Sequence, residues 1–158
     1  MTMNKNISLG KIFPPTFRLV AMPLVAVLLI SLLMSSSSHK TTIFIIGDST
    51  AAEKGNYRNY PERGWGMVFQ GCFDDQIIVD NHAVNGRSSK SFLDEGRWQK
   101  ILDKMQPGDY VIIQFGHNDE KKFPNRYTIP GGTFDAHLAK YVNETRQKGG
   151  IPVLMNSV

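Results

Sequence analysis

The chain has 158 residues, which suffices for one ordinary domain and not for two. Its net charge of +4 comes mostly from residues 1–38, where three basic residues and no acidic ones occur; the remainder holds 15 Lys and Arg against 14 Asp and Glu. A nearly neutral domain has no basic surface for nucleic acid, so we expect no nucleic-acid partner. Cys72 is the single cysteine, which excludes an internal disulfide.

Residues 1–38 have the pattern of a targeting segment. Lys5, Lys11 and Arg18 precede an almost wholly apolar stretch over residues 19–34, and four serines follow it. This order is typical of a secretory signal. The stretch is short for a membrane span and contains Pro23, so we expect a signal peptide, with a retained N-terminal anchor as the alternative. The sequence therefore predicts a secreted or periplasmic protein that meets the membrane only through this segment.

The rest of the chain, residues 41–158, alternates between short apolar segments and amphipathic ones. Apolar segments rich in Ile and Val occupy residues 43–46, 77–79, 110–114 and 152–155, as strands buried on both faces of a parallel sheet do. Helical patterns cover residues 66–73, 91–105 and 133–148, the last ending at Gly149 and Gly150. The sequence therefore predicts an α/β fold with a mainly parallel sheet.

Glycine and small polar residues follow three of these strands. The segments are GDST at 47–50, HAVNGRSS at 82–89 and GHND at 116–119. The carboxyl ends of parallel strands meet at one edge of the sheet, where ligands bind in open α/β folds. We therefore expect these three segments to form one site.

The residue types in these segments suit acyl transfer. Ser49 is a candidate nucleophile, and the N–H of Gly86 and the side-chain amide of Asn118 are candidate donors to the oxygen on which negative charge develops. Each has a structural alternative: a helix cap for Ser49, a turn for Gly86 and a loop for Asn118. Asp48 fits either a turn or the orientation of a donor. His117 fits a general base or a solvated loop residue.

The order of these motifs resembles that of the SGNH (GDSL-type) hydrolases. The segments RGWG (63–66), NGRSSKSFLDEGRW (85–98), PGDYVIIQFGHNDEK (107–121) and GGIPVL (149–154) are similar to the rhamnogalacturonan acetylesterases, and the resemblance runs from about Thr41 to Val158. It implies a three-layer α/β/α, flavodoxin-like domain. The implied protein is a monomeric serine esterase that removes acetyl groups from pectic polysaccharide.

The resemblance also implies the roles of the site residues. Ser49 is the nucleophile, and its own N–H, the N–H of Gly86 and the Asn118 side chain form the oxyanion hole. No metal or organic cofactor is implied, and the partner is an acetylated polysaccharide or oligosaccharide. His117 occupies a variable position of the family and is not its catalytic histidine.

The family's Asp-x-x-His block does not occur in this sequence, so the catalytic Asp and His are not present in the chain. Asp80 with His82, and Asp135 with His137, have the wrong spacing. In the strand order 2-1-3-4-5, a fifth strand is absent and the fourth forms an exposed apolar edge. We therefore expect a C-terminally truncated part of a longer esterase, nearly inactive by itself because it lacks the base that activates Ser49.

Two other functions fit the sequence. A carbohydrate-binding protein without catalysis would use Trp65, Trp98, Arg126 or Tyr127 as sugar contacts, although core packing fits both tryptophans. Phosphate binding at the turn 47–50 is the other alternative, but this turn lacks the Lys and the additional glycines of a P-loop.

Overall fold

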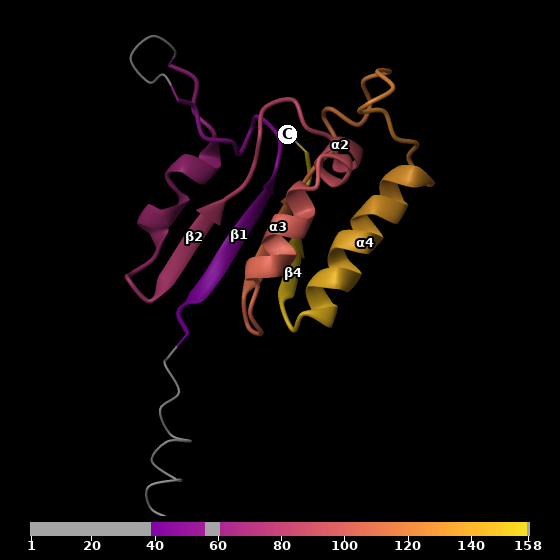
Figure 1. Cartoon of the computed structure of the whole chain (residues 1–158). Coiled ribbons are helices and arrows are strands. Elements are labelled where there is room, and N and C mark those ends of the chain that lie inside the picture. The colour runs from indigo at the N-terminus through magenta and orange to yellow at the C-terminus, as the bar shows by residue number, and fades with distance from the viewer. Residues whose placement is uncertain (1–38, 56–60, 158) are drawn as a thin grey trace, which may run out of the picture. The chain divides into compact units, whose positions relative to one another are not determined.

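The computed structural model describes residues 39–55 and 61–157 (Figure 1). The predicted signal peptide or anchor, residues 1–38, lies outside the described residues. Within the part that is described, no helix is both long enough and apolar enough to cross a membrane.

Four parallel strands form the sheet, in the order β2-β1-β3-β4. They are β1 (Thr41–Gly47), β2 (Ile77–Asn81), β3 (Tyr110–Gln114) and β4 (Ile151–Leu154). The predicted parallel sheet and its strand order are confirmed. Ile45 of the central strand lies opposite Asn81 on one side and Ile112 on the other, so β1, β2 and β3 end at one edge.

The sheet separates two apolar layers because successive side chains of β1 point to opposite faces. Phe44 and Ile46 face the larger layer, where α2 (Ser89–Asp94), α3 (Arg97–Lys104) and α4 (Thr133–Gln147) cover the sheet. Figure 1 shows these three helices together on one side of the strands. Their buried contributions include Phe92, Trp98, Ile101 and Tyr141. The continuous apolar sequence of β1 is therefore explained by burial on both faces.

Ile43 and Ile45 face the second layer, which contains no α-helix among the described residues. The short helix predicted at 66–73 consists of two 3-10 turns, η2 (Trp65–Met67) and η3 (Phe69–Cys72). Trp65, Phe69 and Phe73 pack there in successive edge-to-face pairs. The prediction of one helical segment is thus corrected to two tight turns that bring three aromatic rings onto the sheet.

The single helix predicted over 91–105 was also wrong. Ser88 and Ser91 form a capping box that starts α2 two residues earlier than predicted. Gly96 then takes a left-handed conformation, with φ of +66°, and its N–H donates to the carbonyl of Leu93. A glycine tolerates this conformation without steric cost, so the chain ends α2 and begins α3 in a new direction.

The polar groups of the helical layer are paired. Tyr141 is fully buried and donates its hydroxyl to the carbonyl of Ser89 at 2.7 Å, and burial raises the pKa of this phenol. Trp98 donates its indole N–H to Glu144 at 2.6 Å. Burial raises the pKa of Glu144, but hydrogen bonds from Lys140 and Trp98 outweigh burial and leave that pKa below its usual value.

Strand β4 forms an exposed edge in the described structure, as predicted. It pairs with β3, and Ile151, Val153 and Leu154 are 43%, 39% and 56% exposed. These values contrast with the completely buried Ile45 and Ile46 of the central strand.

Candidate active site

The segments that follow β1, β2 and β3 contact one another, as the sequence predicts. The N–H of Val84 donates to the carbonyl of Gly47 at 3.1 Å, which joins the first segment to the second. Asn118 Nδ2 donates to Asp48 Oδ2 at 3.3 Å, which joins the third to the first. Ser49, Gly86 and Asn118 therefore belong to one cluster of loops at the carboxyl edge of the sheet.

Asp48 organises the turn that carries Ser49. Its carboxylate is 2% exposed, and Oδ1 accepts a hydrogen bond from the N–H of Thr50 at 3.0 Å and lies 3.0 Å from the Thr50 hydroxyl. Oδ2 holds the amide of Asn118. Asp48 therefore fills both of the roles considered for it, because it forms the turn and orients a donor from another strand end.

Ser49 lies in this turn, half-buried. No helix begins among residues 48–55; the segment is an isolated turn in which the N–H of Ala52 donates to the carbonyl of Asp48. Ser49 is therefore not the cap of a helix, which was its structural alternative. Its hydroxyl makes no hydrogen bond with another described residue, and such a free hydroxyl suits a nucleophile better than a structural role. The buried carboxylate of Asp48 also makes this turn unsuitable for phosphate.

The amide of Asn118 is held from both ends. Lys121 Nζ donates to Asn118 Oδ1 at 3.1 Å, while Nδ2 donates to Asp48. A cation at the oxygen and a carboxylate at the nitrogen leave one orientation for the amide. Nδ2 keeps a second N–H, which is the donor that an oxyanion requires.

Lys54 connects the first two segments and was not identified from the sequence. Its side chain is 7% exposed, and Nζ donates to the carbonyl of Ser49 at 2.7 Å and to Asn85 Oδ1 at 2.8 Å. Glu62 lies 3.9 Å from the same ammonium. The lysine therefore bridges the Ser49 turn and the residue before Gly86. No motif marks it, since its partners are known only once the chain is folded.

Gly86 lies in a turn, as its dipeptide with Asn85 predicted, and has a φ of +72°. This conformation favours glycine. A Cβ at Gly86 would point toward Arg126, 3.5 Å from both terminal guanidinium nitrogens. The glycine thus leaves open the space between its backbone and this arginine.

Gln114 ties the last residue of β3 to the opposite layer. It is 2% exposed, and its Oε1 accepts from Trp65 Nε1 at 2.8 Å and lies 3.0 Å from Thr50 Oγ1, whose single proton it shares with Asp48 Oδ1. Trp65 therefore supports the Ser49 turn from the side. Trp98, 3% exposed, belongs to the core, so it is not a sugar contact in this structure.

The histidines make contacts away from Ser49. His82 Nε2 lies 2.9 Å from Asp80 Oδ2, which Lys104 also contacts at 3.0 Å. Burial raises the pKa of Asp80, but the hydrogen bonds from His82 and Lys104 outweigh burial and hold that pKa below its usual value. His117 is exposed, and its backbone N–H donates to Ser157 Oγ.

A buried polar cluster lies behind the third segment. Asp119, 4% exposed, accepts from the N–H and hydroxyl of Ser89 and from Thr128 Oγ1 at 3.0 Å. His137 Nδ1 contacts the same Ser89 hydroxyl at 3.1 Å. This serine is completely buried, and the aspartate bonds the serine instead of the histidine. The cluster is therefore a structural support, because a catalytic triad requires an accessible serine and an aspartate on its histidine.

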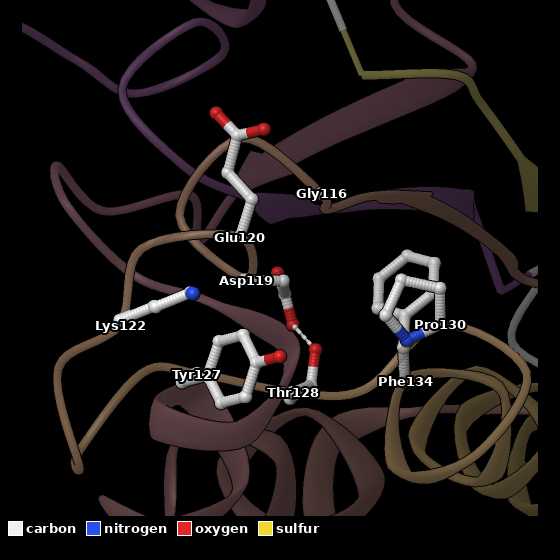
Figure 2. A pocket seen from close by; sticks show the side chains of 8 residues that line it. All are labelled: Gly116, Asp119, Glu120, Lys122, Tyr127, Thr128, Pro130 and Phe134. Carbon is white, nitrogen blue, oxygen red and sulfur yellow. Dashed lines mark hydrogen bonds between the residues drawn. The ribbon is translucent and has the colours of Figure 1, made fainter.

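A cavity of about 420 Å³ borders this cluster (Figure 2). Figure 2 shows Asp119 bonded to Thr128 near the middle of the view, with Glu120 pointing away. Ser49, Gly86 and Asn118 do not line this cavity. The cavity and the three site residues have only the turn 116–120 in common, since this turn lines the cavity and also carries Asn118. Among the described residues, no group of three or more His, Cys, Asp or Glu is placed to hold a metal ion.

Similarity to known proteins agrees with this arrangement. The probable rhamnogalacturonan acetylesterase YesY of Bacillus subtilis is 42% identical over 117 residues, which are 73% of this chain and 53% of YesY. The rhamnogalacturonan acetylesterase RhgT of the same organism is 42% identical over 116 residues, 73% of this chain and 48% of RhgT. The chain thus spans about half the length of these curated relatives.

The fold also matches a solved structure. The crystal structure of protein YxiM from Bacillus subtilis superposes with a TM-score of 0.62 at 26% identity, over 75% of this chain and 33% of that protein. The family model of the GDSL-like lipases and acylhydrolases matches residues 45–158, which include all three segments of the site. This chain therefore belongs to the GDSL-like lipase/acylhydrolase family.

Proposed function

We propose that the protein is a serine esterase that removes acetyl groups from a pectic polysaccharide. The observation that carries this proposal is the convergence of Ser49, Gly86 and Asn118 at one edge of the sheet, with Asn118 oriented by Asp48 and Lys121. The rhamnogalacturonan acetylesterases among its relatives support acetyl esters of this polysaccharide as substrate.

In the proposed reaction, Ser49 Oγ attacks the carbonyl carbon of the acetyl ester. The N–H groups of Ser49 and Gly86 and the second N–H of Asn118 Nδ2 donate to the oxyanion of the tetrahedral intermediate. Each such donor contributes roughly 2.7–4 kcal/mol to transition-state stabilisation. The sugar hydroxyl then leaves, and water releases acetate from the acetyl-serine.

Attack by Ser49 also requires a general base that takes the hydroxyl proton. His82 is bound to Asp80, and His137 contacts the buried Ser89, so neither supplies this function in the described structure. We further propose that the protein acts as a secreted or periplasmic monomer, exported by residues 1–38 or anchored by residues 19–34. Sequencing the N-terminus of protein recovered outside the cytoplasm tests the export.

The proposed activity is tested by acetate release from acetylated rhamnogalacturonan and by hydrolysis of 4-nitrophenyl acetate, using the full-length protein. Ser49→Ala should abolish both activities, whereas Gln76→Ala, which removes an exposed side chain just before the start of β2, should keep them. An organophosphonate should label Ser49, as shown by mass spectrometry of the peptide. The alternative is a protein that binds the polysaccharide without catalysis. It would be established if the wild type released no acetate and Ser49→Ala bound the polysaccharide as tightly as the wild type.

A further inference from the structure

Arg126 lies beside the glycine of the proposed oxyanion hole, although the two residues are 40 positions apart in the sequence. Its two terminal nitrogens are 3.5 Å from the position that a Cβ of Gly86 would take. The backbone N–H of Arg126 donates to the carbonyl of Phe123 at 2.9 Å. Its guanidinium carbon lies 5.8 Å from the centre of the Phe123 ring. A local turn and a ring contact therefore hold this cation against the site.

The neighbouring arginines, Arg87 and Arg97, share one carboxylate partner, whereas Arg126 has none among the described residues. Arg87 Nε and Arg97 Nε both contact Glu95 Oε2, at 3.1 and 2.5 Å. Burial raises the pKa of Glu95, but its hydrogen bonds to Arg97 and Arg87 outweigh burial and hold that pKa below its usual value, so this carboxylate remains charged and engaged.

All 14 acidic residues of the chain lie in the described ranges, and none of them forms an ion pair with Arg126. The local balance is therefore an excess of positive charge beside Gly86. A half-buried guanidinium without a carboxylate partner suits an anionic ligand.

The space in front of this arginine is shaped as a small pocket. Its volume is about 170 Å³, and its lining residues are Gly86, Arg87, Ser91, Glu95, Asn125 and Arg126. This cavity borders the oxyanion-hole glycine directly, whereas the larger cavity of Figure 2 does not. Because Gly86 carries no side chain, nothing from that residue enters the space before the guanidinium.

We propose that Arg126 binds a uronate carboxylate of the polysaccharide close to the acetyl ester, so that the protein selects acidic over neutral acetylated polysaccharides. This inference rests on the proposed function. A planar guanidinium binds a carboxylate through two parallel N–H···O bonds, which fixes both its position and its orientation. Glu95 holds Arg87 in place at the rim, and Asn125 adds an uncharged polar lining. Bound in this way, the uronate places the nearby acetyl ester next to Gly86.

The test compares Arg126→Gln with the wild-type full-length protein on three substrates. These are acetylated rhamnogalacturonan oligosaccharides, the same oligosaccharides with their carboxyl groups converted to methyl esters, and 4-nitrophenyl acetate. Arg126→Gln should lower kcat/KM on the acidic substrate by about 10- to 100-fold, as expected for a lost charge-assisted hydrogen bond. On the other two substrates, both proteins should behave alike. The wild type's preference for the acidic substrate should also shrink as the salt concentration rises.

Arg146→Gln is the matched control, because this arginine is exposed in the last turn of α4, which leads to the amino end of β4 and not to the carboxyl edge of the sheet. It should leave all three activities unchanged. Arg126→Lys keeps the charge but loses the two-bond geometry, so an intermediate loss is expected. An equal loss on the acidic and the methyl-esterified substrates would overturn the proposal, because the arginine would then act only on the structure of the site.

Binding provides a readout that does not depend on turnover. Calorimetric titration of the Ser49→Ala protein with unacetylated galacturonate oligomers should show binding that Arg126→Gln weakens at least tenfold, and galactan oligomers should not compete. A wild type that binds the acidic oligomers but hydrolyses no ester would disprove the proposed esterase while supporting the uronate subsite. If Arg126→Gln binds galacturonate oligomers as tightly as the protein with Arg126, the proposed uronate subsite is refuted, whether or not the protein hydrolyses esters.

Discussion

Replacing Lys54 by methionine tests whether the ammonium group maintains the geometry between Ser49 and Gly86. The ammonium is 7% exposed and donates to the Ser49 carbonyl at 2.7 Å and to Asn85 Oδ1 at 2.8 Å. A hydrogen bond to a charged group contributes about 1.5–3 kcal/mol, and methionine leaves both acceptors without their donor. Burying a thioether instead of an ammonium recovers part of this loss, because the desolvation cost of the charge disappears. We expect a net loss of about 2–4 kcal/mol in the free energy of unfolding.

The same substitution should reduce kcat more than it raises KM. Lys54 connects the nucleophile's turn to the segment of the oxyanion-hole glycine, and a misplacement of about 1 Å between catalytic groups costs on the order of 100-fold in rate. The assays are urea denaturation and acetate release by the full-length protein. Lys40→Met is the matched control, because Lys40 is exposed and, among the described residues, donates to a single acceptor, the carbonyl of Asp75, so its loss should cost less than about 0.5 kcal/mol.

Two results would refute this reasoning about Lys54. Unfolding free energies that are equal for Lys54→Met and Lys40→Met would show that other contacts hold the two segments together, such as the bond from Val84 to Gly47. A lower stability with an unchanged kcat would show that the lysine supports the fold without setting the catalytic geometry.

Three further predictions concern Asp119, Gly64 and Glu144. Asp119→Ala should lower the free energy of unfolding by about 3 kcal/mol in urea denaturation, because the buried N–H and hydroxyl groups of Ser89 and Thr128 then have no carboxylate to donate to. Gly64→Ala should cost about 3 kcal/mol, since the new Cβ would lie 2.1 Å from a backbone carbonyl oxygen, whereas Gly71→Ala meets no atom within 4 Å and should cost almost nothing in the same assay. The pKa of Glu144 is lower in the folded than in the unfolded protein, so its carboxylate stabilises the fold above about pH 4.3 and loses this contribution as the pH falls further. Glu144→Gln has no such contribution to lose, and its stability should therefore fall less than that of the wild type between pH 5 and pH 3. Exposed Glu120, replaced by Gln, is the control, and equal acid sensitivity of the two variants would contradict this prediction.

Sequence reasoning predicted the sheet because its evidence is local. Apolar segments of three to five residues, three of them followed by glycine and small polar residues, indicate buried parallel strands and a common edge. The strand order and the contact between the Asp48 and Asn118 segments agree with that reasoning. The candidate roles of Ser49, Gly86 and Asn118 came from the order of their motifs, and their activity stays a prediction.

Helix boundaries were less predictable. The pattern of residues 91–105 fits one amphipathic helix, yet Gly96 adopts a left-handed conformation and separates α2 from α3. Periodicity alone does not reveal whether a glycine continues or ends a helix, because its intrinsic cost within a helix is only about 1 kcal/mol. The tertiary packing of Phe92 and Trp98 in the same apolar layer decides between one continuous helix and two separate ones.

The sequence by itself determined the family, the alternation of strands and helices, and the three segments that carry Ser49, Gly86 and Asn118, since these depend on neighbouring residues and on motif order. Only the tertiary structure showed that Lys54 bridges Ser49 and Asn85, that Asp119 forms a buried support, and that Arg126 faces Gly86 without an acidic partner. These contacts join residues 5 to 40 positions apart, on loops that have no regular period. Long-range pairing of this kind is set by how the loops pack at the sheet edge, so no local pattern in the chain encodes it.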